Sequence, residues 1–268
     1  MNRFARTFER LRARGECGLF PYVMAGFPDI ATSHALADAA LNVGADGFEI
    51  AVPFSDPLAD GTTMQRVNAR ALGGGAGLDT ALELVRTIRR RAPETPLALM
   101  SYYNPLRQRG DDVLARNLAA AGGDGVIVAD MPAEEASQLH TALDAHGLGL
   151  APLIAPTSTP ARIRAAAALD PVFFYCVALV GVTGARSDLS AALGDFLTRV
   201  RAETSTPRVV GFGISRPDHV RRVAQLGAEG VIVASALVDL IDKAADPVAA
   251  ARDYLREMKA GGLSAVAG

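Results

Sequence analysis

The sequence predicts an α/β protein, a single (β/α)8 TIM barrel domain over residues 1–268, and three observations support this prediction. Short apolar runs alternate with amphipathic helical patterns along the whole chain. The runs number eight, and a helical pattern follows each of them, as in a parallel barrel. The chain length fits this fold, and no Ser- or Pro-rich linker divides the sequence. An open doubly wound sheet is the alternative.

The predicted strands are short apolar runs, as expected for parallel strands that are buried on both faces. In chain order they are Leu19–Ala25, Gly47–Val52, Leu97–Ser101, Gly125–Ala129, Leu148–Leu153, Val172–Leu179, Arg208–Phe212 and Gly230–Ala234. The predicted helices between them are Ser33–Val43, Leu78–Arg91, Asp111–Ala121, Ala133–Ala145, Ala161–Leu169, Ser190–Arg201 and Pro217–Leu226. Two extra helices are expected, one at the N terminus where Phe4, Phe8 and Leu11 recur at helical spacing, and a short one at Leu237–Ile241 after the last strand.

A weak internal repeat aligns Gly44–Ala51 with Gly122–Ala129 and Gly227–Ala234. Each copy has the pattern of a helix end, a tight turn and a strand. In this alignment Glu49 takes the position of Ile127 and Ile232, whereas Phe48, Val126 and Val231 occupy the opposite strand face. If the first set faces the inside of the barrel, Glu49 is a lone carboxyl group in an apolar pocket.

Composition argues against several classes of partner. The formal net charge of -2, from 27 basic and 29 acidic side chains, provides no basic surface for a nucleic acid. The longest apolar run, Val172–Val182, is interrupted by Gly181 and is too short to span a bilayer. Cys17 and Cys176 lie far apart without metal-binding or redox spacing, which favours reduced thiols and a cytoplasmic location.

Glu49 and Asp60 are the candidate acid–base residues. Glu49 interrupts an apolar strand, so burial should raise its pKa and allow it to give and take a proton near neutral pH. Asp60 ends a loop that contains Pro53 and Pro57, and we expect it to be more exposed to solvent and more often ionised than Glu49. A structural ion pair is the alternative for Glu49, and a turn-forming role is the alternative for Asp60.

Three loops are candidates for binding a phosphate group at the carboxyl ends of the strands. Gly211–Ser215 follows the seventh predicted strand, and Ser215 with Asp218 resembles a capping box. Ser235 precedes the short last helix, whose first N–H groups favour an anion, and Gly181–Arg186 offers a hydroxyl and free amides. These loops predict a phosphorylated small molecule as ligand, and ordinary turn and capping glycines are the alternative.

Metal and nucleotide chemistry find little support in the sequence. The four histidines fall on predicted helices without the spacing of metal ligands, and solvated positions explain them: His34, His140, His146 and His219. The Gly211-Phe212-Gly213 triplet lacks the third glycine of a dinucleotide-binding motif. We therefore expect neither a metal ion nor a nucleotide cofactor.

Six motifs in order along nearly the whole chain resemble those of the tryptophan synthase α-subunit family. They are Pro53–Gly61 with Glu49 upstream, Ala25–Asp29, Tyr102–Pro105, Ala129–Pro132, Gly181–Gly184 and Gly211–Ser215. The resemblance implies retro-aldol cleavage of indole-3-glycerol phosphate to indole and glyceraldehyde 3-phosphate, without a metal or organic cofactor in this chain. It implies that Glu49 shuttles protons, that Asp60 stabilises positive charge at the indole N–H, and that Tyr175 holds the glycerol chain.

The resemblance also implies the remaining site residues. An apolar slot for indole would consist of Tyr22, Met64, Met100, Ile127, Leu153, Phe212 and Ile232, and the phosphate would lie against Thr183, Gly184, Gly213 and Ser235. Core packing is the alternative for the slot residues. Near the site the chain departs from the family pattern at Met24, Ala51, Thr62, Ala178 and Ala234. The Ala234 methyl group would crowd the phosphate-binding amides, and Met24 would replace a hydroxyl near Glu49.

The implied partner is the β subunit, which carries pyridoxal phosphate and receives indole through a tunnel. The contact would involve exposed loop residues, namely Pro53, Phe54, Asp56, Pro57, Leu58, Asn104 and Pro132, although proline and phenylalanine can also stiffen a loop. Three alternatives remain open: a stand-alone lyase that supplies indole to another pathway, a weakly active or silent subunit that binds and activates a β partner, and another phosphate-binding barrel enzyme such as an isomerase.

Overall fold

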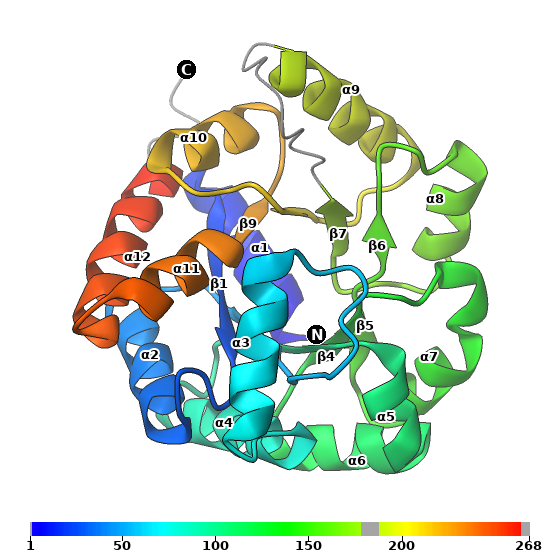
Figure 1. Ribbon diagram of the computed structural model, residues 1–268. Helices are drawn as coiled ribbons and strands as arrows, with labels where there is room; N and C mark the ends of the chain where they lie inside the picture. Colours follow the sequence, from blue (N-terminus) through cyan, green and yellow to red (C-terminus); the bar gives the residue numbers. More distant parts are fainter. Residues whose placement is uncertain (1, 178–187, 264–268) are drawn as a thin grey trace.

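The computed structural model describes residues 2–177 and 188–263, which form a ring of parallel strands surrounded by helices (Figure 1). In the described residues the strands are β1 (Gly18–Met24), β2 (Phe48–Ala51), β3 (Leu97–Ser101), β4 (Gly125–Val128), β5 (Gly149–Leu150), β6 (Leu153–Ile154), β7 (Phe174–Val177), β8 (Arg208–Gly211) and β9 (Gly230–Val233). Every pairing between neighbouring strands is parallel.

The sheet closes on itself through the fifth predicted strand. The order of the strands is β5-β4-β3-β2-β1-β9-β8-β7-β6. The two end strands, β5 and β6, follow each other in the chain, and together they correspond to the predicted strand Leu148–Leu153. Pro152 has no N–H to donate, so the ladder is interrupted between the two pieces. Ala151 N–H still donates to the Val126 carbonyl (2.9 Å), and the Pro152 carbonyl accepts from Tyr175 N–H (3.0 Å). The predicted eight-stranded barrel is therefore confirmed, with one strand in two pieces.

Helices surround the ring and close one of its ends (Figure 1). They are α1 (Arg3–Arg14), α2 (Ile30–Asn42), α3 (Thr62–Gly73), α4 (Leu78–Arg91), α5 (Tyr103–Arg109), α6 (Asp111–Ala121), the 3-10 helix η1 (Ala133–Glu135), α7 (Ser137–Asp144), α8 (Pro160–Ala167), α9 (Asp188–Glu203), α10 (Pro217–Gln225), α11 (Ser235–Lys243) and α12 (Pro247–Leu263). Both expected extra helices are present, as α1 and α11. The sequence did not predict α3, α5 or α12, and the predicted helix Ala133–Ala145 is broken into η1 and α7. No described helix has the length and apolar character needed to cross a bilayer.

Two separate hydrophobic cores show which way the strand residues point. The inner core includes Ile127 and Ile232, and the outer core, beneath the helices, includes Phe48, Val126 and Val231. This division confirms the two strand faces expected from the internal repeat. Glu49 shares its face with the inner set and pairs in register with Ala98, another inner-core residue. The carboxyl group of Glu49 is therefore directed into the barrel.

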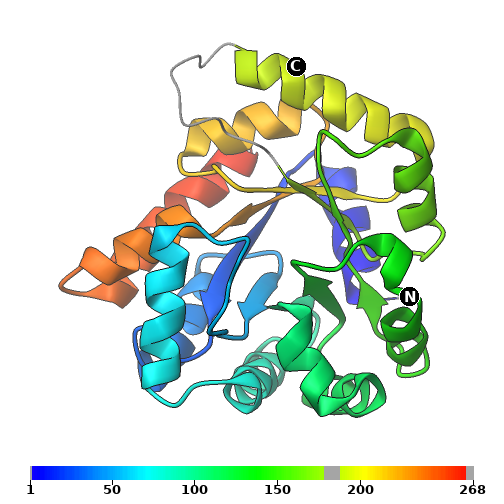
Figure 2. The same cartoon turned by 45° about the vertical axis from the view of Figure 1, so that its right-hand side comes forward.

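Helix α1 closes one end of the barrel. In both views it lies across the ring of strands, in dark blue (Figures 1 and 2). Phe4 and Phe8 of this helix enter the inner core, where the Phe4 ring lies 5.2 Å from that of Phe173 and the Phe8 ring lies 5.7 Å from that of Phe20. This aromatic cluster fills the amino-terminal end of the barrel and leaves the other end for a site.

The third residue of each internal repeat is a carboxylate that ties neighbouring strands together at this closed end. Asp46 accepts from Leu19 N–H (2.9 Å) and Asp124 accepts from Leu97 N–H (2.9 Å). The third repeat follows the same pattern, since Glu229 accepts from Arg208 N–H (2.8 Å). Each of the three carboxylates also pairs with a cationic side chain, namely Lys259, Arg89 and Arg208 respectively. The repeat thus has a structural role at the end opposite to the candidate site.

Candidate functional site

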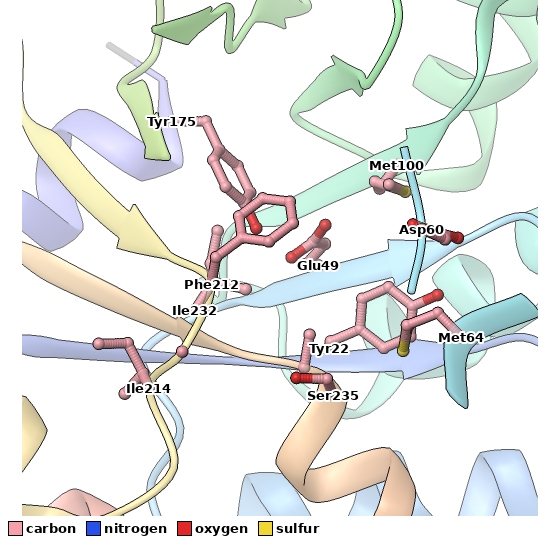
Figure 3. Close-up of a pocket in the computed structure, with 12 residues that line it drawn as sticks. Tyr22, Glu49, Asp60, Met64, Met100, Tyr175, Phe212, Ile214, Ile232 and Ser235 are labelled. Carbon is pink, nitrogen blue, oxygen red and sulfur yellow. The ribbon is translucent and has the colours of Figure 1, made fainter. Parts of the chain in front are cut away.

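A pocket opens at the carboxyl ends of the strands and has an empty volume of about 460 Å³, including its opening to solvent (Figure 3). It is lined by Tyr22, Glu49, Asp60, Met64, Met100, Tyr175, Phe212, Gly213, Ile214, Ile232, Ala234 and Ser235. All of these except Ile214 are residues that the sequence or the family resemblance singled out. Ile214 lies inside the Gly211–Ser215 motif, so its position in that loop was the available signal.

Two expected site residues of the described chain are not in this lining. Ile127 is fully buried in the inner core, and Leu153 packs against that core. Their strand face was predicted correctly, but the alternation of side chains does not reveal depth along the barrel axis. Thr183 and Gly184 lie outside the described residues, as does the departure at Ala178.

Glu49 occupies the centre of the pocket. Its side chain lies between Tyr175, Met100 and Tyr22 in Figure 3, and it is only 2% exposed. Burial, and secondarily the negative charge of Asp60, raises its pKa from 4.5 to about 8. No ion pair involves Glu49 among the described residues, and its buried Oε2 atom has no hydrogen-bond partner there. The structural ion-pair alternative thus has no support, and a carboxyl group in this state is suited to proton transfer.

Asp60 is half-buried at the edge of the same pocket. Burial raises its pKa, whereas hydrogen bonds from the Tyr102 hydroxyl and the Asn68 amide (3.2 Å) oppose that change. Asp60 is more exposed to solvent than Glu49, as expected, although burial outweighs the two donors in its effect on the pKa. Its backbone N–H bonds to the Pro57 carbonyl (3.0 Å), so the backbone makes the turn while the carboxylate remains directed to the site.

Asn68 and Tyr102 hold this loop, and the sequence predicted a role for neither residue, although Tyr102 begins the Tyr102–Pro105 motif. Asn68 is 3% exposed, and its Oδ1 atom accepts from Phe54 N–H (2.8 Å). The Tyr102 hydroxyl accepts from Ala59 N–H (2.9 Å), and its ring lies 5.4 Å from that of Phe54. A signal for Asn68 existed, since it is a polar residue within the apolar face of α3. Together the two residues fix the loop that carries Asp60.

Tyr175 depends on the missing side chain at Gly211. A Cβ atom built on Gly211 would lie 2.2 Å from the Tyr175 hydroxyl, so only glycine leaves room for this ring position. Burial raises the pKa of Tyr175 well above its ordinary value, which keeps the hydroxyl protonated. The next residue, Phe212, has φ +70°, is 44% exposed and packs edge-on against Tyr175 at 6.0 Å. A bulky residue with positive φ is strained backbone of the kind that persists at functional sites.

The opposite side of the pocket has features of an anion site. Helix α11 begins at Ser235, and its N-cap Ala234 makes no side-chain hydrogen bond, so the first N–H groups of the helix are uncapped. Gly213 adopts φ +75° in the turn after β8. All three residues line the pocket, and the Ala234 methyl group shares this space. The predicted capping box is wrong, because α10 has Arg216 at its N-cap and Asp218 pairs with Arg221 (2.8 Å).

The loop residues expected to face a partner divide into two groups. Asp56, Leu58, Asn104 and Pro132 are exposed, and Leu58 is 91% exposed. Pro53 and Pro57 are buried, and Phe54 is half-buried against Tyr102, so the expectation that these residues are exposed is wrong. The buried residues stiffen the loop that holds Asp60, which leaves the four exposed side chains as the accessible part of this surface.

No group of three or more potential metal ligands occurs in the described parts of the chain. The four histidines are half-buried instead of solvated, which corrects the expectation from the sequence. His146 lies 3.1 Å from Asp112, and His219 contacts the turn after β8.

A family model described as tryptophan synthase alpha chain matches residues 8–265. The chain belongs to the tryptophan synthase alpha chain family. The tryptophan synthase alpha chain of Roseiflexus sp. strain RS-1 is 49% identical over 261 residues, which cover 97% of this chain and 100% of that protein. That of Chloroflexus aurantiacus is 47% identical over 269 residues, 100% of this chain and 99% of the relative.

Solved structures agree with this assignment. Tryptophan synthase subunit alpha from Legionella pneumophila has a TM-score of 0.90 at 35% identity, with 97% of this chain and 98% of that chain covered. A tryptophan synthase structure from M. tuberculosis in an aminoacrylate-bound form has a TM-score of 0.88 at 34% identity, with 98% and 100% covered. The TIM-barrel fold predicted from the sequence is the fold of the family.

Most departures from the pattern of the tryptophan synthase alpha chain family that fall in the described residues are not part of the pocket lining. Met24 is buried and lines an apolar hollow with Phe27 instead of the pocket that contains Glu49. Ala51 is buried two residues after Glu49 and pairs in register with Met100, and Thr62 is the exposed first residue of α3. Of the departures within the described residues, only Ala234 lines the pocket.

Proposed function

We propose that the chain cleaves indole-3-glycerol phosphate to indole and glyceraldehyde 3-phosphate, as the alpha chain of a tryptophan synthase. The observation that carries this proposal is Glu49, a buried carboxyl group with a pKa of about 8 at the centre of the pocket. Its Oε2 atom has no hydrogen-bond partner in the described structure, so it can form a hydrogen bond with a bound ligand. Family membership supports a lyase that acts in tryptophan biosynthesis.

The two ends of the pocket match the two ends of this substrate. Apolar side chains such as Met64 and Met100 offer a slot for indole, with Asp60 at the same edge of the pocket (Figure 3). Gly213 and the uncapped N terminus of α11 offer backbone N–H groups for the phosphate. Glu49 lies between these ends, beside the bond that would break.

The proposed reaction breaks the carbon–carbon bond between indole C3 and the glycerol chain by two proton transfers that involve Glu49. Neutral Glu49 donates its proton to indole C3, which makes the ring an electron acceptor. The glycerol hydroxyl then loses its proton to the Glu49 carboxylate, the carbonyl of glyceraldehyde 3-phosphate forms, and the electrons of the broken bond restore the aromatic ring. Glu49 ends protonated, as it began, and a pKa of about 8 suits both transfers near neutral pH.

Asp60 and Tyr175 would support this chemistry without exchanging protons. An ionised Asp60 stabilises the positive charge that develops on the indole nitrogen when C3 is protonated. Hydrogen bonds from Asn68 and Tyr102 favour that ionised form. Tyr175 keeps its hydroxyl proton because burial raises its pKa, so it acts as a hydrogen-bonding group for the glycerol chain or Glu49. The cleavage needs only proton transfer and charge stabilisation, so we infer that this chain uses no cofactor or metal.

The proposal includes a β subunit as partner, with pyridoxal phosphate bound there. Exposed Asp56, Leu58, Asn104 and Pro132 follow strands β2, β3 and β4, which are adjacent in the sheet. They therefore lie on one side of the pocket opening, and an exposed leucine among polar residues fits an interface. Asp56 is the candidate for an ion pair with the partner.

The proposal is tested by measuring indole formation from indole-3-glycerol phosphate with and without a β subunit. We expect Glu49→Gln to abolish measurable activity and Glu83→Gln, a change at an exposed residue of α4, to leave it intact. Binding of an indolylpropanol phosphate analogue by Glu49→Gln would show that the pocket remains formed. Wild-type activity in Glu49→Gln would refute the assignment.

The same assay separates the alternative functions. A rate that a β subunit does not change would support a stand-alone lyase. A complex that forms without indole production would identify a silent activating subunit. Failure of the wild-type chain to bind the indolylpropanol phosphate analogue would favour a different phosphate-binding barrel enzyme.

A further inference from the structure

His219 lies behind the turn that connects β8 to α10, outside the pocket lining. Its Nδ1 atom is 3.1 Å from the Gly213 carbonyl oxygen and 3.4 Å from the Ser215 backbone nitrogen. Its Nε2 atom is 3.0 Å from Nη2 of Arg216. Because Gly213 lines the pocket and His219 does not, any effect of the histidine on a ligand passes through the turn.

The three contacts select one protonation state of the ring. A guanidinium group only donates hydrogen bonds, so Nε2 of His219 must be an unprotonated acceptor for Arg216. A neutral imidazole then carries its proton on Nδ1, and this N–H donates to the Gly213 carbonyl. The same nitrogen cannot also accept from Ser215, which is the longest of the three contacts. The two shorter contacts are therefore satisfied together by a single tautomer.

The turn that His219 contacts needs external support. Phe212 has φ +70° and Gly213 has φ +75°, so two successive residues adopt the left-handed conformation. Such a conformation costs free energy for phenylalanine and persists only where surrounding contacts fix it. The bond from His219 to the Gly213 carbonyl is one such contact, made from the first turn of the following helix.

The bond also fixes the orientation of one peptide group. In a trans peptide the C=O and N–H groups point in opposite directions. The carbonyl of Gly213 points toward His219 on α10, so the N–H of Ile214 points away from that helix. Gly213 and Ile214 both line the pocket on the side of Ser235. The carbonyl oxygen is thus held away from a bound anion, which it would repel, and an N–H group is presented instead.

We propose that His219 is a positioning residue for phosphate binding, which holds the turn after β8 in the orientation that accepts the anion. Arg216 has a supporting role, since its hydrogen bond to Nε2 fixes the tautomer that donates to Gly213. The inference rests on the proposed function, because it assumes a phosphorylated substrate. Neither residue touches the reacting atoms.

The test compares two ligands and two substitutions in the full chain. The ligands are an indolylpropanol phosphate analogue and indole, which shares the ring but lacks the phosphate. His219→Leu removes the donor while keeping a similar volume, and His219→Asn places an amide N–H near the position of Nδ1. We expect His219→Leu to weaken binding of the phosphate analogue about 5- to 10-fold, as for loss of one hydrogen bond, and to leave indole binding within about twofold.

His219→Asn is expected to retain most of the affinity for the phosphate analogue. Leucine favours helices more than asparagine does, so a purely structural role for this position would rank the variants in the opposite order. His146→Leu, which removes a histidine–carboxylate contact far from the pocket, is the matched control and should bind both ligands as the wild type does. Equal affinities of the wild type and His219→Leu for the analogue would overturn the inference, as would equal losses for both ligands.

Amide hydrogen exchange of Phe212–Ser215 without ligand separates this inference from the proposed function. We expect faster exchange in His219→Leu than in the wild type or His219→Asn, because the turn loses its anchor. Unchanged exchange would overturn the role of His219 even if the chain forms indole. If the wild type neither forms indole nor binds the analogue, the proposed function fails, and the exchange result then decides whether His219 fixes the turn.

Discussion

Replacing Glu49 by glutamine should make the stability of the protein less dependent on pH. Glutamine keeps the size and polarity of the side chain but cannot ionise. Wild-type Glu49 has a pKa of about 8 in the folded protein, compared with 4.5 as its ordinary value. The unfolded chain therefore releases this proton at a lower pH than the folded protein does, and deprotonation favours unfolding.

The magnitude follows from the two pKa values. Below about pH 4 both states hold the proton, and the ionisation of Glu49 costs no stability. As the pH rises, the ionisation of Glu49 lowers the free energy of unfolding of the wild type by about 1 kcal/mol at pH 5 and by about 4 kcal/mol at pH 8, where the folded state also begins to ionise. Above about pH 8 the loss levels off near 5 kcal/mol. Glu49→Gln lacks this contribution, so the difference between the two proteins should change by about 3 kcal/mol from pH 5 to pH 8.

Urea unfolding of the wild type and Glu49→Gln at several pH values between about 5 and 9 measures this difference. Other titrating groups affect both proteins equally and cancel in the comparison. Glu83→Gln is the control, since that carboxylate is exposed and its variant should follow the wild type. Parallel pH dependence of the wild type and Glu49→Gln would refute the claim that burial holds the Glu49 proton.

Three further predictions concern the same site. The value of kcat/KM for indole formation should fall about tenfold for each pH unit above about 8, because neutral Glu49 is the proton donor, and a pH–rate profile measures this. Gly211→Ala should lower the free energy of unfolding by about 1–3 kcal/mol in urea unfolding, because its methyl group displaces the Tyr175 ring. Asn68→Asp should reduce the indole-forming rate about tenfold near pH 7, because a second carboxylate replaces a donor to Asp60 and raises its pKa.

Matched variants on α3 are the controls for Gly211→Ala and Asn68→Asp. Gly73→Ala adds a methyl group to a glycine with open space around it and should not destabilise the protein. Ala69→Asp adds a carboxylate on the exposed face of the same helix and should leave the indole-forming rate nearly unchanged. Equal stability of the Gly211 and Gly73 variants, or equal rates for the Asn68 and Ala69 variants, would contradict the corresponding prediction.

Strand periodicity was sufficient to predict the position of Glu49, because side chains two residues apart must share a face. The alignment with Ile127 and Ile232 predicted the inward direction, and the two separate cores confirm it. The same periodicity could not distinguish the lining of the pocket from the inner core, where Ile127 lies. The depth of a residue in a barrel depends on strand tilt and on neighbouring side chains, which a single strand does not encode.

Contacts between distant residues explain most of what the sequence did not reveal. Asn68 bonds to Phe54, 14 residues away, and Tyr102 bonds to Ala59, 43 residues away. No local pattern links these pairs, since their proximity depends on the loop after β2 folding over α3 and β3. The break in the fifth strand at Pro152 had a visible signal, because proline cannot donate to a strand ladder.

The order of the strands around the barrel has a consequence for the newly made protein. Glu49 and Asp60 belong to the first half of the chain, whereas the amides proposed for the anion follow β8 and β9, and β9 pairs directly with β1. The acid–base residues and the amides proposed for the anion therefore come together only when the ring of strands is complete. A ribosome-bound chain that ends before residue 230 should lack affinity for the substrate, even though its carboxyl groups have long been synthesised.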